Sequence, residues 1–287
     1  MTSPAPTAIL LVCCPDRRGI VAALSAFITE HHGNIIALDQ YVDTANGVFF
    51  ARMEWELDGF TLPMEGFAAA FRPLAEPWGI QWSLHLSTAR LRMAVMVSRQ
   101  AHCLYDILAR TESGEWPVDI ALVLSNHPDH RPLAERHGIP FQHIPVTAAT
   151  RAEAEPLQIR ALRDAGADFI VLARYMQILS PAFVQAFPMR ILNIHHSFLP
   201  AFAGARPYHA AHDRGVKIIG ATAHYVTENL DEGPIIEQDV IRVSHRQGVE
   251  DLVRLGRDLE KIVLSRAIYA HLTHRILVYQ NRTVVFT

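Results

Sequence analysis

Between residues 91 and 195, short apolar runs alternate with stretches of helical periodicity. The apolar runs are LRMAVMVS (91–98), VDIALVLSN (118–126), PFQHIPV (140–146), DFIVLA (168–173) and RILNIH (190–195). Helical patterns separate them around residues 101–112, 129–137, 150–165 and 180–187. Apolar strands that alternate with helices predict a doubly wound, mostly parallel α/β sheet covered on both faces. Two more strands, IIGATAHYV and PIIEQDVIRV, and one long amphipathic helix follow.

The first 86 residues have a different order of elements. AILLVCC is a strand, IVAALSAFITEHH a helix, and the next two strands are joined by the hairpin signal TANG. A second helix and the strand IQWSLHLS complete the order βαββαβ, which predicts a ferredoxin-like unit. We therefore expect two domains, residues 1–86 and 91–287, with STAR at 87–90 as the junction.

Charge and cysteine content narrow the class of protein. The formal net charge is −3 over 287 residues, which indicates no nucleic-acid partner. The three cysteines, Cys13, Cys14 and Cys103, include no CxxC pair, which favours free thiols in a reducing cytoplasm. The start MTSPAPT lacks the basic region of a signal peptide, and no apolar run is long enough for a membrane span. We expect a cytoplasmic protein with no membrane partner.

Polar residues gather where the RILNIH run ends. Ligands of open α/β sheets bind beyond the carboxyl ends of the strands. Asn193 and His195 share a face of this strand, because side chains two apart point the same way, and an amide beside an imidazole can polarise a carbonyl. His196 points away, which favours a packing role and argues against a metal site. A core role for His195 stays open.

Asp231 lies downstream in HYVTENLDEGPIIEQD, in a loop between two strands. An aspartate there often caps or turns the chain, and this interpretation stays open. Near His195, its carboxylate would act as a general base or orient the imidazole. Asn193, His195 and Asp231 together suit the addition of water or an amine to an acyl carbon, and Ser197 has no GxSxG context.

Long motifs extend this interpretation to a known family. They are CPDRRGIVAALSAFITEHHGNI, SRQAHCLYDIL, LVLSNHPD, VLARYMQILS, NIHHSFLPAF, PYHAAHDRGVKIIGATAHYV, NLDEGPII and NRTVVF. From about residue 8 to the end, the chain resembles the formyltetrahydrofolate deformylases, which join an ACT domain to a Rossmann-like formyltransferase domain. The resemblance implies hydrolysis of 10-formyltetrahydrofolate to tetrahydrofolate and formate, which supplies formate and balances the one-carbon folate pool for purine synthesis. It also implies that Asn193, His195 and Asp231 are catalytic. Since no HExxH or CxxC motif supports a metal site, we expect neither a metal nor another cofactor.

The same resemblance implies the folate-binding residues. Four residues of RYMQIL would wall the folate cleft: Met176, Gln177, Ile178 and Leu179. Backbone groups of Val226, Thr227 and Glu228 would bind the pterin. For the apolar residues, above all Ile178, a place in the core is the alternative.

The resemblance also separates a hydrolase from a transferase. Related glycinamide ribonucleotide transformylases carry a glycine-rich turn after the first strand of this domain, which binds the substrate phosphate. This chain has VSRQAHCLYD there, without the glycine that a tight anion-binding turn requires. His102 and Cys103 stand in its place as a plug or as support for the site. The alternatives are a formyltransferase acting on an unphosphorylated amine, and a folate or amino-acid sensor without chemistry.

The first domain is expected to bind an effector. Backbone N–H groups of the helix after Gly19 can hold a carboxylate, and Asp16 or Asn34, next to Ile35, can hold an ammonium group. Glycine or methionine are the candidates, and a cap at Asp16 with a turn at Gly19 is the alternative. Because ferredoxin-like sheets have an edge that can pair, we expect a homo-oligomer, with a tetramer as the best guess.

Overall fold

The computed structural model describes residues 5–200 and 207–287. Contacts divide the chain into two compact units. The first contains the residues up to Ala89 together with Thr273–Tyr279 and Thr283–Thr287, and the second contains Arg90–Leu272 and Gln280–Arg282. The first division, between Ala89 and Arg90, lies within residues 87–90. The C-terminal residues, which the sequence analysis assigns to a domain spanning 91–287, group with the first unit instead.

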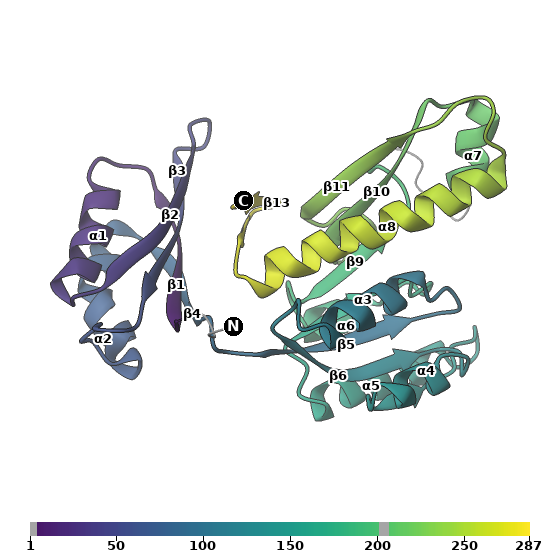
Figure 1. The fold of residues 1–287 in the computed structure, drawn as a ribbon, viewed down its shortest axis with the longest axis horizontal. Coiled ribbons are helices and arrows are strands. Elements are labelled where there is room, and N and C mark those ends of the chain that lie inside the picture. The colour runs from purple at the N-terminus through teal and green to yellow at the C-terminus, as the bar shows by residue number, and fades with distance from the viewer. Residues whose placement is uncertain (1–4, 201–206) are drawn as a thin grey trace. The chain divides into compact units, whose positions relative to one another are not determined.

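The first unit is an antiparallel sheet with two helices on one face (Figure 1). The strands are in the order β2-β3-β1-β4, with bounds Thr7–Pro15 for β1, Asn34–Asp43 for β2, Val48–Glu56 for β3 and Gln81–Leu86 for β4. The helices are α1 (Ile20–Glu30) and α2 (Met64–Ala75), followed by the short 3-10 helix η1 (Glu76–Trp78). Alternate residues of β1, such as Leu10 and Val12, pack beneath the helices. This confirms the predicted ferredoxin-like βαββαβ order.

A C-terminal hairpin packs on the other face of this sheet. It consists of β12 (Ile276–Tyr279) and β13 (Arg282–Val285). Leu11 and Phe50 point to this face and share a buried cluster with Phe286. Both faces of the small sheet are therefore covered, although the hairpin is more than 180 residues from β4 in the sequence.

The second unit is a seven-stranded sheet in the order β11-β10-β9-β8-β5-β6-β7. The strands are β5 (Leu91–Val97), β6 (Val118–Ser125), β7 (Phe141–His143), β8 (Phe169–Leu172), β9 (Ile191–His195), β10 (Ile218–Tyr225) and β11 (Ile235–Arg242). Strands β5 to β9 pair in parallel, whereas β10 is antiparallel to both of its neighbours. This confirms the predicted doubly wound, mostly parallel domain.

Helices join and cover these strands (Figure 1). They are α3 (His102–Glu112), α4 (Arg131–Arg136), α5 (Arg151–Asp164), α6 (Pro181–Ala186), α7 (Pro207–Arg214) and α8 (Val249–Leu272). The long helix α8 packs across β9, β10 and β11 and also contacts α3 and α7. Among the described residues, every helix is too short or too polar to span a bilayer.

Candidate active site

Asn193 and His195 lie at the carboxyl end of β9. This strand pairs with β10 in a register that places His224 opposite Asn193 and Thr222 opposite His195. His195 is only 5% exposed, and Asn193 is partly buried. The pairing with β10 holds both side chains at one end of the sheet, as the strand parity predicts.

Asp231 faces this strand end from the loop between β10 and β11. Its Oδ2 atom lies 3.2 Å from Nδ1 of His195, and its Oδ1 atom lies 3.7 Å from Nε2 of His224. Its backbone has a left-handed φ of 56°, which aspartate tolerates better than most residues. Asp231 therefore turns the chain, and its carboxylate also contacts the His195 imidazole.

The two imidazoles determine the charge of Asp231. Burial by itself would raise the pKa of this carboxyl group, but the contact with His195, together with the nearby His224 ring, outweighs it and holds the pKa well below the usual range. Asp231 is thus an ionised acceptor. Since the carboxylate faces Nδ1 of His195, that nitrogen carries a proton, and Nε2 is buried without a partner among the described residues. This atom is available to a reacting group.

His224 is 2% exposed, and the sequence pattern indicates no role for it. Its Nδ1 atom lies 2.8 Å from the carbonyl oxygen of Tyr225, and its Nε2 atom lies 3.2 Å from Nδ2 of Asn193. Because a carbonyl oxygen only accepts, Nδ1 carries a proton, and Nε2 can then accept from the Asn193 amide. His224 then accepts one N–H of the Asn193 amide, and the second N–H of that amide is left for another acceptor.

His196 has the packing position that was expected. Its ring lies 5.2 Å from that of His195 and 6.1 Å from that of Tyr208, measured between ring centroids. Burial lowers the pKa of His196 to about 4, aided by the nearby charges of Arg174 and His195, so the ring is neutral at pH 7. In the described part of the chain, the side chains that lie close enough to share a metal ion are His102, Cys103 and Glu260, and not the adjacent histidines.

The expected folate-binding residues lie after β8 and β10. Met176 and Ile178 are 50% and 57% exposed, so Ile178 is not a core residue. The Met176 N–H donates to the Ser98 hydroxyl, which fixes the start of this segment next to the end of β5. The N–H of Val226 already donates to the carbonyl of Ile191, which leaves its carbonyl for a ligand. Gln177, Leu179 and Thr227 are partly buried, and Glu228 is exposed.

The expected effector residues lie apart within one chain. Gly19 has a φ of 92° at the start of α1, and Asp16 is exposed just after β1. Asn34 begins β2, next to Ile35, and donates to Glu56 of β3. Since β1 and β2 both run antiparallel to β3, the end of β1 and the start of β2 are at opposite ends of the sheet. A single domain does not join these groups.

Comparisons with known proteins agree with this geometry. Residues 91–268 match the family model for formyl transferase, and residues 8–54 match the model for the ACT domain. Formyltetrahydrofolate deformylase from Synechocystis sp. is 55% identical over 98% of both chains. The chain belongs to the formyltetrahydrofolate deformylase family. This confirms the resemblance seen in the sequence.

Solved structures of this family share the whole fold. The crystal structure of a formyltetrahydrofolate deformylase from Pseudomonas syringae pv. tomato has a TM-score of 0.96 and 49% identity, and the match covers 99% of this chain and 95% of that one. The glycinamide ribonucleotide transformylase 1 from Symbiobacterium toebii matches 69% of this chain and 95% of its own, with a TM-score of 0.65 and 33% identity. The deformylase fold thus includes both units, whereas the transformylase matches a smaller part of the chain.

Proposed function

We propose that this protein hydrolyses 10-formyltetrahydrofolate to tetrahydrofolate and formate, and so supplies formate and balances the one-carbon folate pool for purine synthesis. The observation that carries this proposal is the contact of 3.2 Å between the Asp231 carboxylate and His195, beside Asn193, in a chain of the deformylase family. These three groups supply what addition of water to a formyl carbon requires. They are a donor for the carbonyl oxygen, a base and a charge that orients the base.

In this mechanism the His195 imidazole transfers the proton. Asp231 accepts from Nδ1, which leaves Nε2 to take a proton from the attacking water, and the carboxylate stabilises the imidazolium that forms. The water oxygen bonds to the formyl carbon, and the bond from that carbon to N10 of the folate breaks. N10 takes the proton from His195, so the products are formate and tetrahydrofolate.

Asn193 stabilises the negative charge that develops on the formyl oxygen. His224 accepts one N–H of its amide, so the second N–H points to the reacting group in a fixed orientation. His224 is therefore a positioning residue in this proposal. The exposed side chains of Met176 and Ile178, with Gln177 and Leu179, form the wall for the folate, and the backbone of residues 226–228 binds the pterin.

One assay distinguishes this function from its alternatives. The protein is incubated with 10-formyltetrahydrofolate as the sole substrate, and formate and tetrahydrofolate are measured. Equal amounts of both products are expected. A transferase would release product only after an amine is added, and a sensor would release none, so either outcome contradicts the proposal.

Activity is expected to be independent of metal, since Asn193 is the proposed polarising group, His195 is the proposed base, and no organic or metal cofactor takes part. Dialysis against a strong chelator should leave the rate of formate release unchanged. The metal content of the protein is measured before and after dialysis as the control. Loss of activity that a single divalent ion restores would contradict this expectation.

The ACT domain is proposed to bind glycine or methionine between two copies of the chain. Asp16 and Gly19 lie at the opposite end of the sheet from Asn34 and Ile35, so a joint site needs a second domain. We therefore propose a homo-oligomer, with a tetramer as the best guess, in the cytoplasm. A hydrolase that consumes formyl-folate needs restraint, and these two amino acids report the state of the one-carbon pool.

Millimolar glycine or methionine is expected to change both the rate of formate release and the melting temperature. An effector acts only through different affinities for the active and inactive states, so both quantities should respond to the same compound. Asp16→Ala should abolish the response, whereas Asp58→Ala, at an exposed aspartate of the same domain, should retain it. The mass in solution is measured in parallel. A response that survives Asp16→Ala, or none in the parent, would make this domain an assembly module instead.

A further inference from the structure

The strand order of the second unit reverses between β5 and β8. Along the chain, β6 and β7 follow on one side of β5, and β8 then pairs with its other side. In open α/β sheets, a ligand binds beyond the carboxyl ends of the strands at such a reversal. The residues that follow β5 and β8 are therefore where a second substrate would be expected.

A buried group of charged side chains occupies this position. His102 begins α3 after β5, Arg174 follows β8, and both contact Glu260 of α8. Nε2 of His102 is 2.7 Å from Oε2 of Glu260, and Nε of Arg174 is 3.4 Å from the same atom. The Tyr208 hydroxyl donates to Oε1 at 2.7 Å. We call these four side chains the Glu260 cluster.

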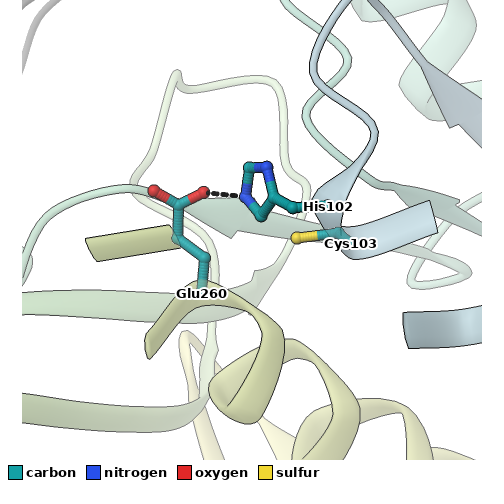
Figure 2. A group of neighbouring side chains, drawn as sticks. All are labelled: His102, Cys103 and Glu260. Atoms are coloured by element: carbon teal, nitrogen blue, oxygen red, sulfur yellow. Dashed lines mark hydrogen bonds and ion pairs between the residues drawn. The ribbon is translucent and has the colours of Figure 1, made fainter. Parts of the chain in front are cut away.

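The cluster is not arranged as a metal site. Figure 2 shows the His102 imidazole, the Cys103 thiol and the Glu260 carboxylate as neighbours, and their ligand atoms lie within 4.8 Å of one another. Both carboxylate oxygens already have donors, and a guanidinium group lies beside them. Burial raises the pKa of the Cys103 thiol, which opposes the thiolate that a metal ion needs. The cluster is a network of ions and hydrogen bonds around the carboxylate, in which Nη1 of Arg174 is buried without a hydrogen-bond partner among the described residues.

The backbone is adapted to this network. Gly256 lies one turn before Glu260 in α8, and a methyl group at this position would overlap the Tyr208 hydroxyl. Glycine is unfavourable inside a helix, so its presence here reflects the space that Tyr208 needs. Arg174 has a left-handed φ of 63°, which L side chains rarely adopt. A glycine inside a helix and a left-handed arginine, both locally unfavourable, thus allow these side chains to come together.

The cluster lies next to the proposed catalytic groups. The His196 ring stands between those of His195 and Tyr208, 5.2 Å and 6.1 Å away. The charges of Arg174 and Glu260 both act on His196. A group placed where the cluster now lies would therefore be separated from His195 by the His196 ring.

We propose that the Glu260 cluster determines acceptor specificity: it occupies the position of a second organic substrate and leaves water as the acceptor. This inference rests on the proposed hydrolysis. Glu260 is 1% exposed and Arg174 is 7% exposed, so protein side chains occupy the position and bury it. A small amine is excluded because it would have to displace a paired carboxylate and guanidinium.

His102 separates this position from the surface. The same side chain that donates to Glu260 also lines a pocket of about 540 Å³. His209 of α7 and Arg257 and Lys261 of α8 are among the other lining residues. Truncation of His102 therefore opens a path from this pocket to Glu260, while Arg174 and Tyr208 still hold the carboxylate.

The test measures how each variant divides the formyl group between water and an amine. Parent and His102→Ala proteins receive 10-formyltetrahydrofolate and an excess of glycinamide, and formate and formylglycinamide are measured. In transfer to the amine, the bond from the formyl carbon to N10 breaks, a bond to the amine nitrogen forms, and the amine proton goes to N10. For His102→Ala, the ratio of formylglycinamide to formate should rise at least roughly tenfold above the parent.

Two further variants complete the design. His102→Gln keeps most of the volume and an N–H donor for Glu260, so it should give the parent ratio. Arg174→Gly opens the position from the other strand, and glycine suits the left-handed backbone there, so it should raise the ratio as His102→Ala does. Circular dichroism and melting curves show which variants are folded.

The outcomes separate this inference from the function itself. Formate release by the parent tests the hydrolysis, whereas the product ratio tests the cluster. The inference is overturned if the folded variants among His102→Ala and Arg174→Gly give the parent ratio. It is also overturned if the parent itself formylates glycinamide or if glycinamide slows formate release by the parent, since an amine would then already reach the position.

Discussion

Asp231→Asn is expected to lower the turnover number by roughly 10³-fold or more, which lies within the range for loss of general acid–base catalysis. Asparagine keeps the shape of the side chain and still accepts from Nδ1 of His195, but it carries no charge to stabilise the imidazolium. Binding of tetrahydrofolate should remain within a few-fold of the parent, because the proposed folate wall is unchanged. Single-turnover formate release and equilibrium binding measure the two effects separately.

Glu232→Gln is the matched control for this variant. It removes the same charge at the next residue, which is exposed, and should leave turnover close to that of the parent. A turnover of Asp231→Asn within tenfold of the parent would remove Asp231 from the mechanism.

Stability should also depend on Asp231 and on pH. The folded state holds the pKa of Asp231 below that of an unfolded aspartate, which is about 4. Its ionised form therefore contributes stability above that pH, and this contribution is lost as the pH falls through the lower folded value. The difference in unfolding free energy between parent and Asp231→Asn should be largest near neutral pH and should shrink in acid.

Local sequence patterns predict the groups that lie close together in the chain. Strand parity places Asn193 and His195 on one face without any structure. The role of His224 is not visible in this way, because its position in an apolar strand looks like that of any buried residue. Its contact with Asn193 depends on the register of β9 against β10. That register follows from the folded sheet and not from the local pattern.

Contacts between distant segments limit what the sequence predicts about the fold and the site. The strands β12 and β13 are four residues long and belong to a sheet face formed far earlier in the chain, so the sequence gives no reason to move them out of the second domain. The burial of Glu260 is equally hard to predict from the sequence. In an amphipathic helix a lone glutamate looks like a surface residue, and its burial depends on Arg174, His102 and Tyr208 from three other segments.

Gly233→Ala is expected to reduce both stability and turnover, because the loop that carries Asp231 is packed against the end of β10. A methyl group at residue 233 would overlap the backbone carbonyl oxygen of Tyr225. Because the backbone fixes the position of this methyl group, no side-chain rotation relieves the overlap. The hydrogen bond from the Tyr225 N–H to the Pro234 carbonyl ties the same two segments together. The unfolding free energy should fall by about 3 kcal/mol, the upper part of the usual range for overpacking.

The loss of turnover in Gly233→Ala follows from the position of Asp231 two residues earlier. Any shift of the loop away from β10 lengthens the contact of 3.2 Å with His195, and a misplacement of about 1 Å at a catalytic group costs roughly 10²-fold in rate. Gly66→Ala in α2 is the control, because a methyl group there meets only ordinary contact at 3.8 Å and alanine favours a helix. It should keep the parent turnover and melt at or above the parent temperature. If Gly233→Ala matches Gly66→Ala in chemical denaturation and in formate release, then the loop does not hold Asp231 in place, and the carboxylate must reach His195 by some other constraint.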